Sequence, residues 1–171
     1  YFYLHFQYNG WMILALVGLF IYVWEQRGLE IPAKTFARFF ISLNLGVVLT
    51  FFLSTLWTKP SFWFYVLAGL GALAQLYAFS VLWSIFKNRI DNLSFSKVQF
   101  LMFKSVLFLL MIKIVLQLLT ALPYFANIAA NYLDLTIGYL HLTFLGIISI
   151  GLFLFMDYFS LFRISKKSYL W

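Results

Sequence analysis

The chain has 171 residues, of which 64% are hydrophobic and 10% are charged, and its mean hydropathy is +0.94. Soluble domains carry about 25% charged residues, so this composition excludes a water-soluble globule and predicts an integral membrane protein. The formal net charge is +7, but the basic residues are dispersed between apolar runs, which excludes a single basic patch for nucleic acid.

Each of five segments is long and apolar enough to cross a bilayer core, which takes about 20 residues of helix. They are Phe2–Trp24, Phe39–Trp57, Phe62–Phe86, Phe100–Leu122 and Ile137–Phe159. The expected fold class is therefore all-α, with residues 1–171 forming one transmembrane bundle of five helices. Because the chain begins at Tyr1 inside the first apolar run, we expect it to be a fragment or a trimmed product of a longer protein.

The first span carries several chemically distinctive side chains at helical spacing. His5, Tyr8, Asn9 and Met12 lie at i, i+3, i+4 and i+7, so they share one face of the helix. An imidazole within a membrane span is a candidate for function, and its structural alternative is a hydrogen bond to a neighbouring helix.

The second and third spans carry small or polar residues close to every fourth position. Ridges of this kind let helices approach closely, so we interpret both as packing surfaces. They consist of Ser42, Gly46, Thr50 and Ser54 in the second span and of Ala68, Gly71, Ala72 and Gln75 in the third.

The fourth span carries a polar stripe formed by Lys113, Gln117 and Thr120 at i, i+4 and i+7. A charge at the bilayer centre costs about 2.5–3.5 kcal/mol, so Lys113 is expected either to point into the bundle and find a partner or to be neutral. Its functional interpretation is a proton relay or a contact to an anionic group such as a haem propionate. Its structural interpretation is a bond to a carbonyl or to Gln75. Lys104, near the other end of the span, is expected to extend toward the headgroups.

The segment 123–136 is nearly uncharged and is expected to be a loop, with Asp134 or Thr136 capping the fifth helix. Asp157 lies at the far end of the fifth span, where we expect it to be solvated at the interface. The composition offers no Gly-rich phosphate loop, zinc-binding His-Glu-x-x-His or Gly-x-Ser-x-Gly elbow. Hydrolase and ATPase activities are therefore not supported.

The two histidines of the chain lie in matched segments, one in the first span and one in the fifth. Each follows Tyr-Leu and is followed by an aromatic residue at the third position and a glycine at the fifth, as in Tyr3–Gly10 and Tyr139–Gly146. Both are expected near the same membrane face, where two imidazoles could bind one haem or share a copper ion. His5 and His141 are thus the candidate cofactor or metal ligands, with Lys113 and Gln117 as candidate polar contacts. The glycine would let a macrocycle or a neighbouring helix approach.

The basic residues predict the orientation of the bundle. If the spans alternate, one face carries nine cationic residues and the other carries only Lys59, which is a strong positive-inside pattern. The N-terminus is therefore expected outside and the C-terminus in the cytoplasm. The nine residues are Arg27, Lys34, Arg38, Lys87, Arg89, Lys97, Arg163, Lys166 and Lys167.

The motifs around His5 and His141, with the segment Lys113–Pro123, resemble polytopic bacterial membrane proteins of the haem–copper oxidase subunit I and NnrS-type group. The resemblance implies that histidines at the outer ends of helices ligate haem or copper, and that further helices precede this chain. Subunit I uses six metal-binding histidines, whereas this chain has two and lacks a His-His pair.

The leading hypothesis is a bacterial inner-membrane protein that binds haem or copper through His5 and His141, with a redox or nitric-oxide-related role. A transporter or channel module with a polar path at Lys113, Gln117 and Gln75 is the second hypothesis, and a non-catalytic scaffold subunit is the third. The expected partners are the lipid bilayer and either upstream helices or another membrane subunit, but no nucleic acid.

Overall fold

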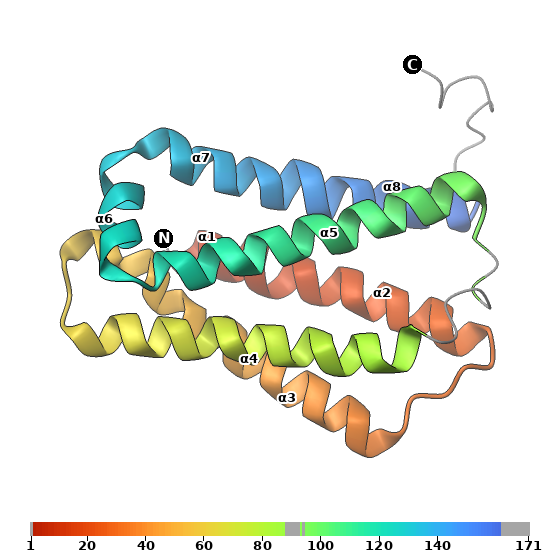
Figure 1. Ribbon diagram of the computed structural model, residues 1–171. Helices are drawn as coiled ribbons and strands as arrows, with labels where there is room; N and C mark the ends of the chain where they lie inside the picture. The colour runs from red at the N-terminus through yellow and green to blue at the C-terminus, as the bar shows by residue number, and fades with distance from the viewer. Residues whose placement is uncertain (1, 88–92, 94, 162–171) are drawn as a thin grey trace.

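Five long apolar helices lie side by side in the protein (Figure 1). The computed structural model describes residues 2–87, 93 and 95–161, and every secondary-structure element in that part of the chain is helical. The five helices, each able to cross a membrane by length and composition, are Phe2–Gln26, Ala33–Leu56, Phe62–Phe86, Lys97–Thr120 and Leu133–Tyr158. They confirm the prediction of an all-α bundle with five membrane spans.

Three of these spans depart from regular α-helix within their length. The first and fifth contain π-helical stretches and the second ends in a 3₁₀ stretch. The elements in chain order are α1 (Phe2–His5), η1 (Phe6–Met12, π), α2 (Ile13–Gln26), α3 (Ala33–Thr50), η2 (Phe51–Thr58, 3₁₀), α4 (Phe62–Phe86), α5 (Lys97–Thr120), α6 (Pro123–Asn131), α7 (Leu133–His141), η4 (Leu142–Ser149, π) and α8 (Ile150–Tyr158).

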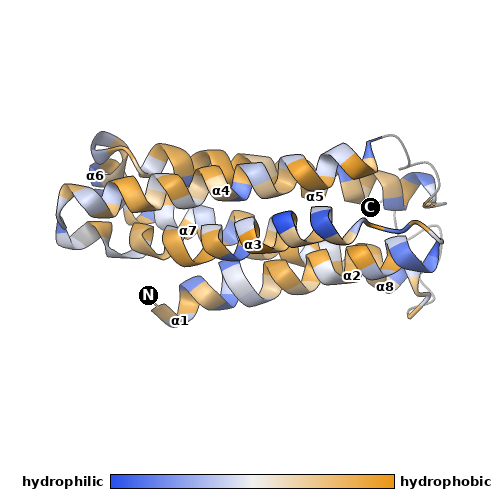
Figure 2. Ribbon diagram, turned by 90° about the horizontal axis from the view of Figure 1, so that it is seen from below, coloured by the Kyte–Doolittle hydropathy of each residue, from blue (hydrophilic) through white to orange (hydrophobic). Residues whose placement is uncertain are grey.

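The chain alternates between two ends of the bundle. We call the end that holds Phe2 and α6 the N-terminal end, and the opposite end, where α2 and α8 finish, the C-terminal end (Figure 1). Hydrophobic residues dominate the long helices between the two ends (Figure 2). The described loops and helix termini with Arg27, Lys87 and Lys97 lie at the C-terminal end, whereas Lys59 lies at the N-terminal end. Arg89, Arg163, Lys166 and Lys167 lie outside the described residues.

The core of the C-terminal half contains aromatic rings from three helices, α2, α4 and α5. Phe20 stacks on Phe103 with ring centroids 5.0 Å apart, and Trp24 packs against Phe86 at 4.3 Å. Aromatic contacts of this kind add to the stabilisation from van der Waals packing that holds helices together within lipid. The Trp24 indole N–H is buried with no acceptor among the described residues.

The predicted small-residue ridges pack α3 against α4, as expected. A Cβ atom on Gly46 would lie 2.6 Å from Gln75 Cγ, and one on Gly71 would lie 2.7 Å from the Thr50 backbone nitrogen. No Cβ atom tolerates such distances, so glycine at both positions permits the close approach of the two backbones.

The structure corrects the predicted ends of several helices. The second span begins at Ala33 rather than Phe39, because Pro32 supplies the extended backbone before the first turn. The segment 123–136 is not a loop, because Pro123 starts α6 and the helical conformation is interrupted only at Tyr132. Tyr132, rather than Asp134 or Thr136, occupies the N-cap of α7, and it makes no side-chain capping bond.

The fourth span begins at Lys97 rather than Phe100 because of a reciprocal cap. Gln99 N–H donates to Ser96 Oγ at 3.2 Å, and Ser96 N–H donates to Gln99 Oε1 at 2.9 Å. The Gln99 side-chain amide also donates to Asp157 Oδ2 at 2.7 Å. Asp157 is therefore bound to the neighbouring helix, where the sequence predicted only solvation.

Candidate functional site

The buried polar side chains come from all five spans. By class they are one imidazole, three amides, two hydroxyls and one amine, with no carboxylate in this set of described residues. They are His5, Asn9, Thr50, Gln75, Lys113, Gln117 and Thr143. Buried polar groups in a membrane bundle need partners within the protein, so the bonds among them define the site.

His5 is anchored across the bundle by a backbone carbonyl. Its side chain is 6% exposed, and Nε2–H donates to Val47 O at 2.9 Å. That carbonyl is available because the second span tightens into η2. There Phe51 N–H donates to Val48 O and Leu49 O instead of Val47 O. The 3₁₀ winding thus releases an acceptor that a continuous α-helix would have used at i+4.

The same carbonyl connects the imidazole to the α3–α4 interface. Thr50 Oγ1 donates to Val47 O at 3.2 Å and to Gly46 O at 2.8 Å. In turn the Gln75 side-chain amide donates to Thr50 Oγ1 at 3.0 Å. Gln75 is therefore a partner of Thr50 and not of Lys113.

The other nitrogen of His5 faces its own helix. Asn9 Nδ2 donates to His5 Nδ1 at 3.3 Å, so the imidazole is neutral with its hydrogen on Nε2. Asn9 Oδ1 accepts a hydrogen bond of 3.2 Å from the Tyr139 hydroxyl of the fifth span. One turn along that span, the buried Thr143 hydroxyl donates to Tyr139 O at 3.0 Å.

Lys113 lies near the Tyr139 ring. Its side chain is 2% exposed, and Nζ lies 5.9 Å from the ring centroid. Nζ donates to Gln117 Oε1 at 3.2 Å. The prediction that Lys113 points into the bundle and finds a partner is confirmed. Thr120, the third member of the predicted stripe, is half-buried and donates to Leu116 O of its own helix.

Each Tyr-Leu-His motif leads directly into a π-helical stretch, η1 after His5 and η4 after His141. The aromatic residues three positions after each histidine contact one another, because the rings of Tyr8 and Phe144 lie 5.8 Å apart edge to face. Single π-helical turns are frequent at functional sites in proteins. The sequence repeat therefore corresponds to a structural repeat at the N-terminal half of the bundle.

The glycines of the two motifs allow neighbouring helices to approach, which was one of the two predicted uses. The position of a Cβ on Gly10 would lie 3.5 Å from Val47 Cγ1. The corresponding position on Gly146 would lie 3.1 Å from Leu109 Cδ1. Both glycines thus face side chains of adjacent spans.

The structure does not bring the two imidazoles into one pocket. His141 is exposed on the surface of the bundle, and its Nδ1 is bonded at 2.9 Å to Ile137 O of its own helix. Both nitrogens of His5 are already hydrogen-bonded, so a metal at either would have to displace Val47 O or Asn9. The described residues do not fit a haem or copper ion held between this pair in the present arrangement.

In residues 2–87, 93 and 95–161, no group of three or more His, Cys, Asp or Glu side chains could hold a metal ion. Haem or copper binding by His5 and His141 stays a prediction.

Comparisons with known proteins leave the chain without an assigned family. No protein-family model matches it, and neither curated proteins nor solved structures give a match. The resemblance to haem–copper oxidase subunit I and NnrS-type proteins stays an expectation based on short motifs.

Three members of the site were missed by reasoning from the sequence. Val47 acts through its carbonyl, and nothing in the sequence shows where a helix tightens to 3₁₀. Tyr139 acts through its hydroxyl, and a tyrosine two residues before a histidine in a span is a visible signal. Thr143 is the one hydroxyl in the run 140–148, and it could have been identified from that contrast.

Proposed function

We propose that this chain is a membrane transport module that recognises a small anion at Lys113. The observation that carries the proposal is the environment of this side chain. It is 2% exposed, and its oxygen partner is the neutral amide of Gln117 rather than a carboxylate. A buried ammonium group is costly within a membrane without an opposite charge, and a bound anion would supply that charge.

The hydrogen-bonding capacity of the site supports an anionic ligand. An ammonium group can donate three hydrogen bonds, and Lys113 donates one to Gln117. The Tyr139 ring lies 5.9 Å from Nζ, and no carboxylate is among the buried polar side chains that the structure describes. A buried cation with unused donors suits an anion and disfavours a metal ion.

Access to Lys113 requires the helices around it to move. The spans that carry its neighbours are irregular at this depth, with η1 and η4 as π-helical stretches. Breaks in helical winding are sites where membrane transporters bind ions and change shape. We propose that these stretches open the site during transport.

The test is anion flux in proteoliposomes, with chloride, phosphate and acetate as probes. Lys113→Met should abolish flux, because it removes the cation but retains most of the side-chain volume. Lys34→Met is the control, because it removes an exposed lysine of the second span that lies outside the polar network. Equal flux through wild type and Lys113→Met would overturn the proposal, as would wild-type flux no greater than that of protein-free vesicles.

A haem- or copper-binding role, linked to redox or nitric-oxide chemistry, is the second candidate. It is favoured by one observation, the matched π-helical stretches that follow His5 and His141. Because the described arrangement separates the two rings, binding would need a rearrangement at His5. A visible spectrum of purified protein tests this candidate. A Soret band lost in His5→Ala and His141→Ala would support it, and a colourless, metal-free protein would eliminate it.

We further propose that the protein lies in a bacterial inner membrane with its C-terminal end in the cytoplasm. The support is the distribution of cationic residues between the two ends, since positive loops are retained on the cytoplasmic side. A folded bundle with neither anion flux nor a cofactor would favour the third role, a scaffold subunit.

A further inference from the structure

A cavity of about 540 Å³ lies in the C-terminal half of the bundle, between α2, α4, α5 and α8. Ligand sites in proteins have volumes of about 300–1,000 Å³, so the cavity is large enough for a substantial ligand. It lies apart from the network described above, because neither His5 nor Lys113 contributes to its lining.

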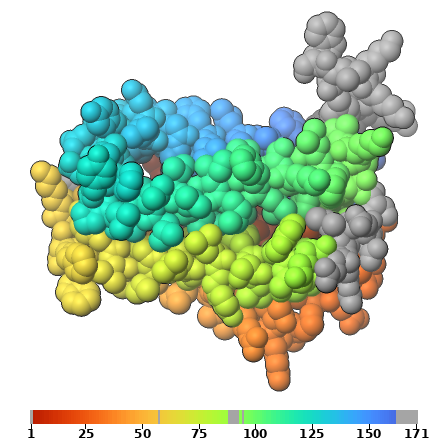
Figure 3. Space-filling view, viewed as in Figure 1, coloured from red at the N-terminus to blue at the C-terminus, as the bar shows by residue number. Residues whose placement is uncertain are grey.

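The cavity opens sideways, toward the surface that faces lipid. Three of its lining residues, Trp83, Phe108 and Met111, are exposed at the junction of α4 and α5. Figure 3 shows a hollow between the surfaces of these two helices. A hydrocarbon chain in the bilayer could therefore enter between α4 and α5 without crossing water.

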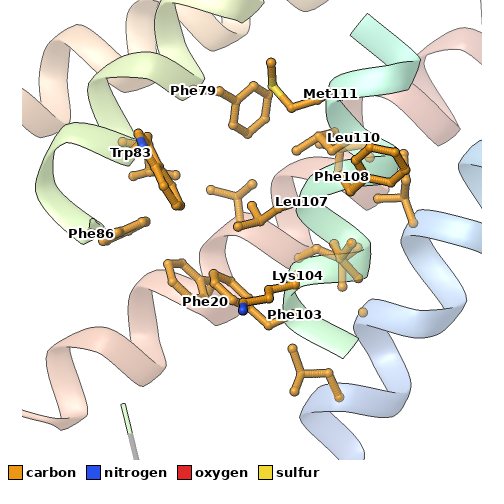
Figure 4. Close-up of a pocket in the computed structure, with 18 of the residues that line it drawn as sticks. Phe20, Phe79, Trp83, Phe86, Phe103, Lys104, Leu107, Phe108, Leu110 and Met111 are labelled. Atoms are coloured by element: carbon orange, nitrogen blue, oxygen red, sulfur yellow. The ribbon is translucent and has the colours of Figure 1, made fainter. Parts of the chain in front are cut away.

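The lining combines an apolar interior with one cation. Phe20, Phe79 and Leu107 point into the cavity, and Lys104 lies among them (Figure 4). The Ser80 hydroxyl also lines the cavity, but it already donates to Tyr77 O at 2.7 Å. A ligand that fits this lining therefore needs a hydrocarbon part for the apolar surface and a negative charge for Lys104.

Lys104 is placed to hold such a charge. It lies seven residues after Lys97, so its Cα is about 10 Å along α5 from the C-terminal end. Its Nζ lies 4.3 Å from the Phe100 ring centroid and contacts no hydrogen-bond acceptor among the described residues. Lysine side chains at this depth extend toward the headgroup level, where Lys87 and Lys97 add positive charge.

We propose that this cavity binds one acyl chain of an anionic phospholipid from the bilayer, with the headgroup held by Lys104. A zwitterionic lipid is a poorer match, because a cation in its own headgroup balances its phosphate, and a helix of a second protein chain is the remaining possible occupant. The site would be a specific lipid position in the leaflet at the C-terminal end.

Native mass spectrometry of the full chain, released from nanodiscs of equal phosphatidylglycerol and phosphatidylcholine, tests the proposal. Wild type should retain more phosphatidylglycerol than phosphatidylcholine. Leu107→Trp should lose it by filling the cavity, whereas Leu101→Trp should not, because Leu101 is on the same helix, 66% exposed and outside the lining. Lys104→Gln should weaken the preference about fivefold, the effect of about 1 kcal/mol per lysine near an anionic surface, and Lys97→Gln should weaken it less.

A second measurement covers the case in which Leu107→Trp does not fold. Lipids with brominated acyl chains quench tryptophan fluorescence on contact, and Trp83 lines the cavity. When the brominated lipid has an anionic headgroup, the fluorescence of wild type should therefore be quenched more than that of Trp83→Phe. Equal retention or equal quenching by both lipid classes would overturn the proposal. So would a dimer that Leu107→Trp converts to a monomer, because a second chain would then be the occupant.

Discussion

His5 and Val47 are joined by a hydrogen bond of 2.9 Å from the imidazole Nε2 to the valine carbonyl, which ties the first span to the second. The bond exists because η2 winds more tightly than an α-helix and frees the carbonyl. From this carbonyl, hydrogen bonds continue to Thr50 and Gln75 on one side and through Asn9 to Tyr139 on the other. A single backbone atom therefore lies at the centre of the polar network.

Replacing His5 should destabilise the bundle far more than replacing His141. His5→Ala removes the cross-helix bond to the Val47 carbonyl and leaves the Asn9 side-chain N–H without an acceptor, which should cost about 1–3 kcal/mol. His141→Ala removes an exposed ring bonded only to its own helix, and it should change stability by less than about 0.5 kcal/mol. Thermal unfolding in detergent, followed by circular dichroism, measures both. A larger loss in His141→Ala would contradict the described burial of the two rings.

Glycine at position 71 should be required for the contact between α3 and α4. In Gly71→Ala the new Cβ would meet backbone atoms of Thr50 at 2.7 Å, so the helices must separate at a cost of about 1–3 kcal/mol. Gly138→Ala is the matched control, because nothing lies within 4 Å of its Cβ position. That change should stabilise the protein by about 0.5–1 kcal/mol through helix propensity. Equal effects of the two substitutions on the melting temperature would show that the α3–α4 contact is looser than described.

Lys113→Met should stabilise the folded bundle while it removes anion flux. The substitution eliminates a buried cation, and insertion scales give such a charge a cost of up to about 3 kcal/mol. Gain of stability with loss of activity is expected where a functional site holds an unfavourable group. The melting temperature and the proteoliposome flux should thus move in opposite directions. A marked loss of stability would instead indicate that Lys113 has a structural role.

The proposed orientation can be tested with single cysteines, since the chain has none of its own. Lys59→Cys and Lys97→Cys place thiols at exposed positions of the N-terminal and C-terminal ends, respectively. A membrane-impermeant maleimide added to intact spheroplasts should label the first and not the second. In inverted vesicles the pattern should reverse, and labelling of Lys97→Cys from outside would overturn the orientation.

Several features of the bundle could be predicted from residue types alone. Long apolar runs have few structures open to them in lipid, so five spans and their sequence positions followed directly. The inward position of Lys113 followed from the cost of exposing a charge to hydrocarbon, and the packing of Gly46 against α4 followed from its size.

Other features depend on properties that composition does not record. The rotation of each helix is weakly encoded when apolar residues cover every face, so His141 could not be assigned to the exposed side. The π and 3₁₀ stretches have no signal in the residue types, and they decide which carbonyls are free. The helix α6 was not predicted because it has only nine residues, too few to form a membrane span, and its sequence has no long apolar stretch.

The acceptor that anchors His5 is a main-chain oxygen, so the hydrogen bond does not depend on which side chain stands at position 47. Sequence drift there from Val47 to isoleucine or leucine would leave the oxygen in place. The anchor can be lost only by changing the imidazole or by rewinding the segment that follows. A mutational survey would therefore register the importance of this bond at position 5 and along η2, whereas substitutions of Val47 would report only on the packing of its side chain against the first span.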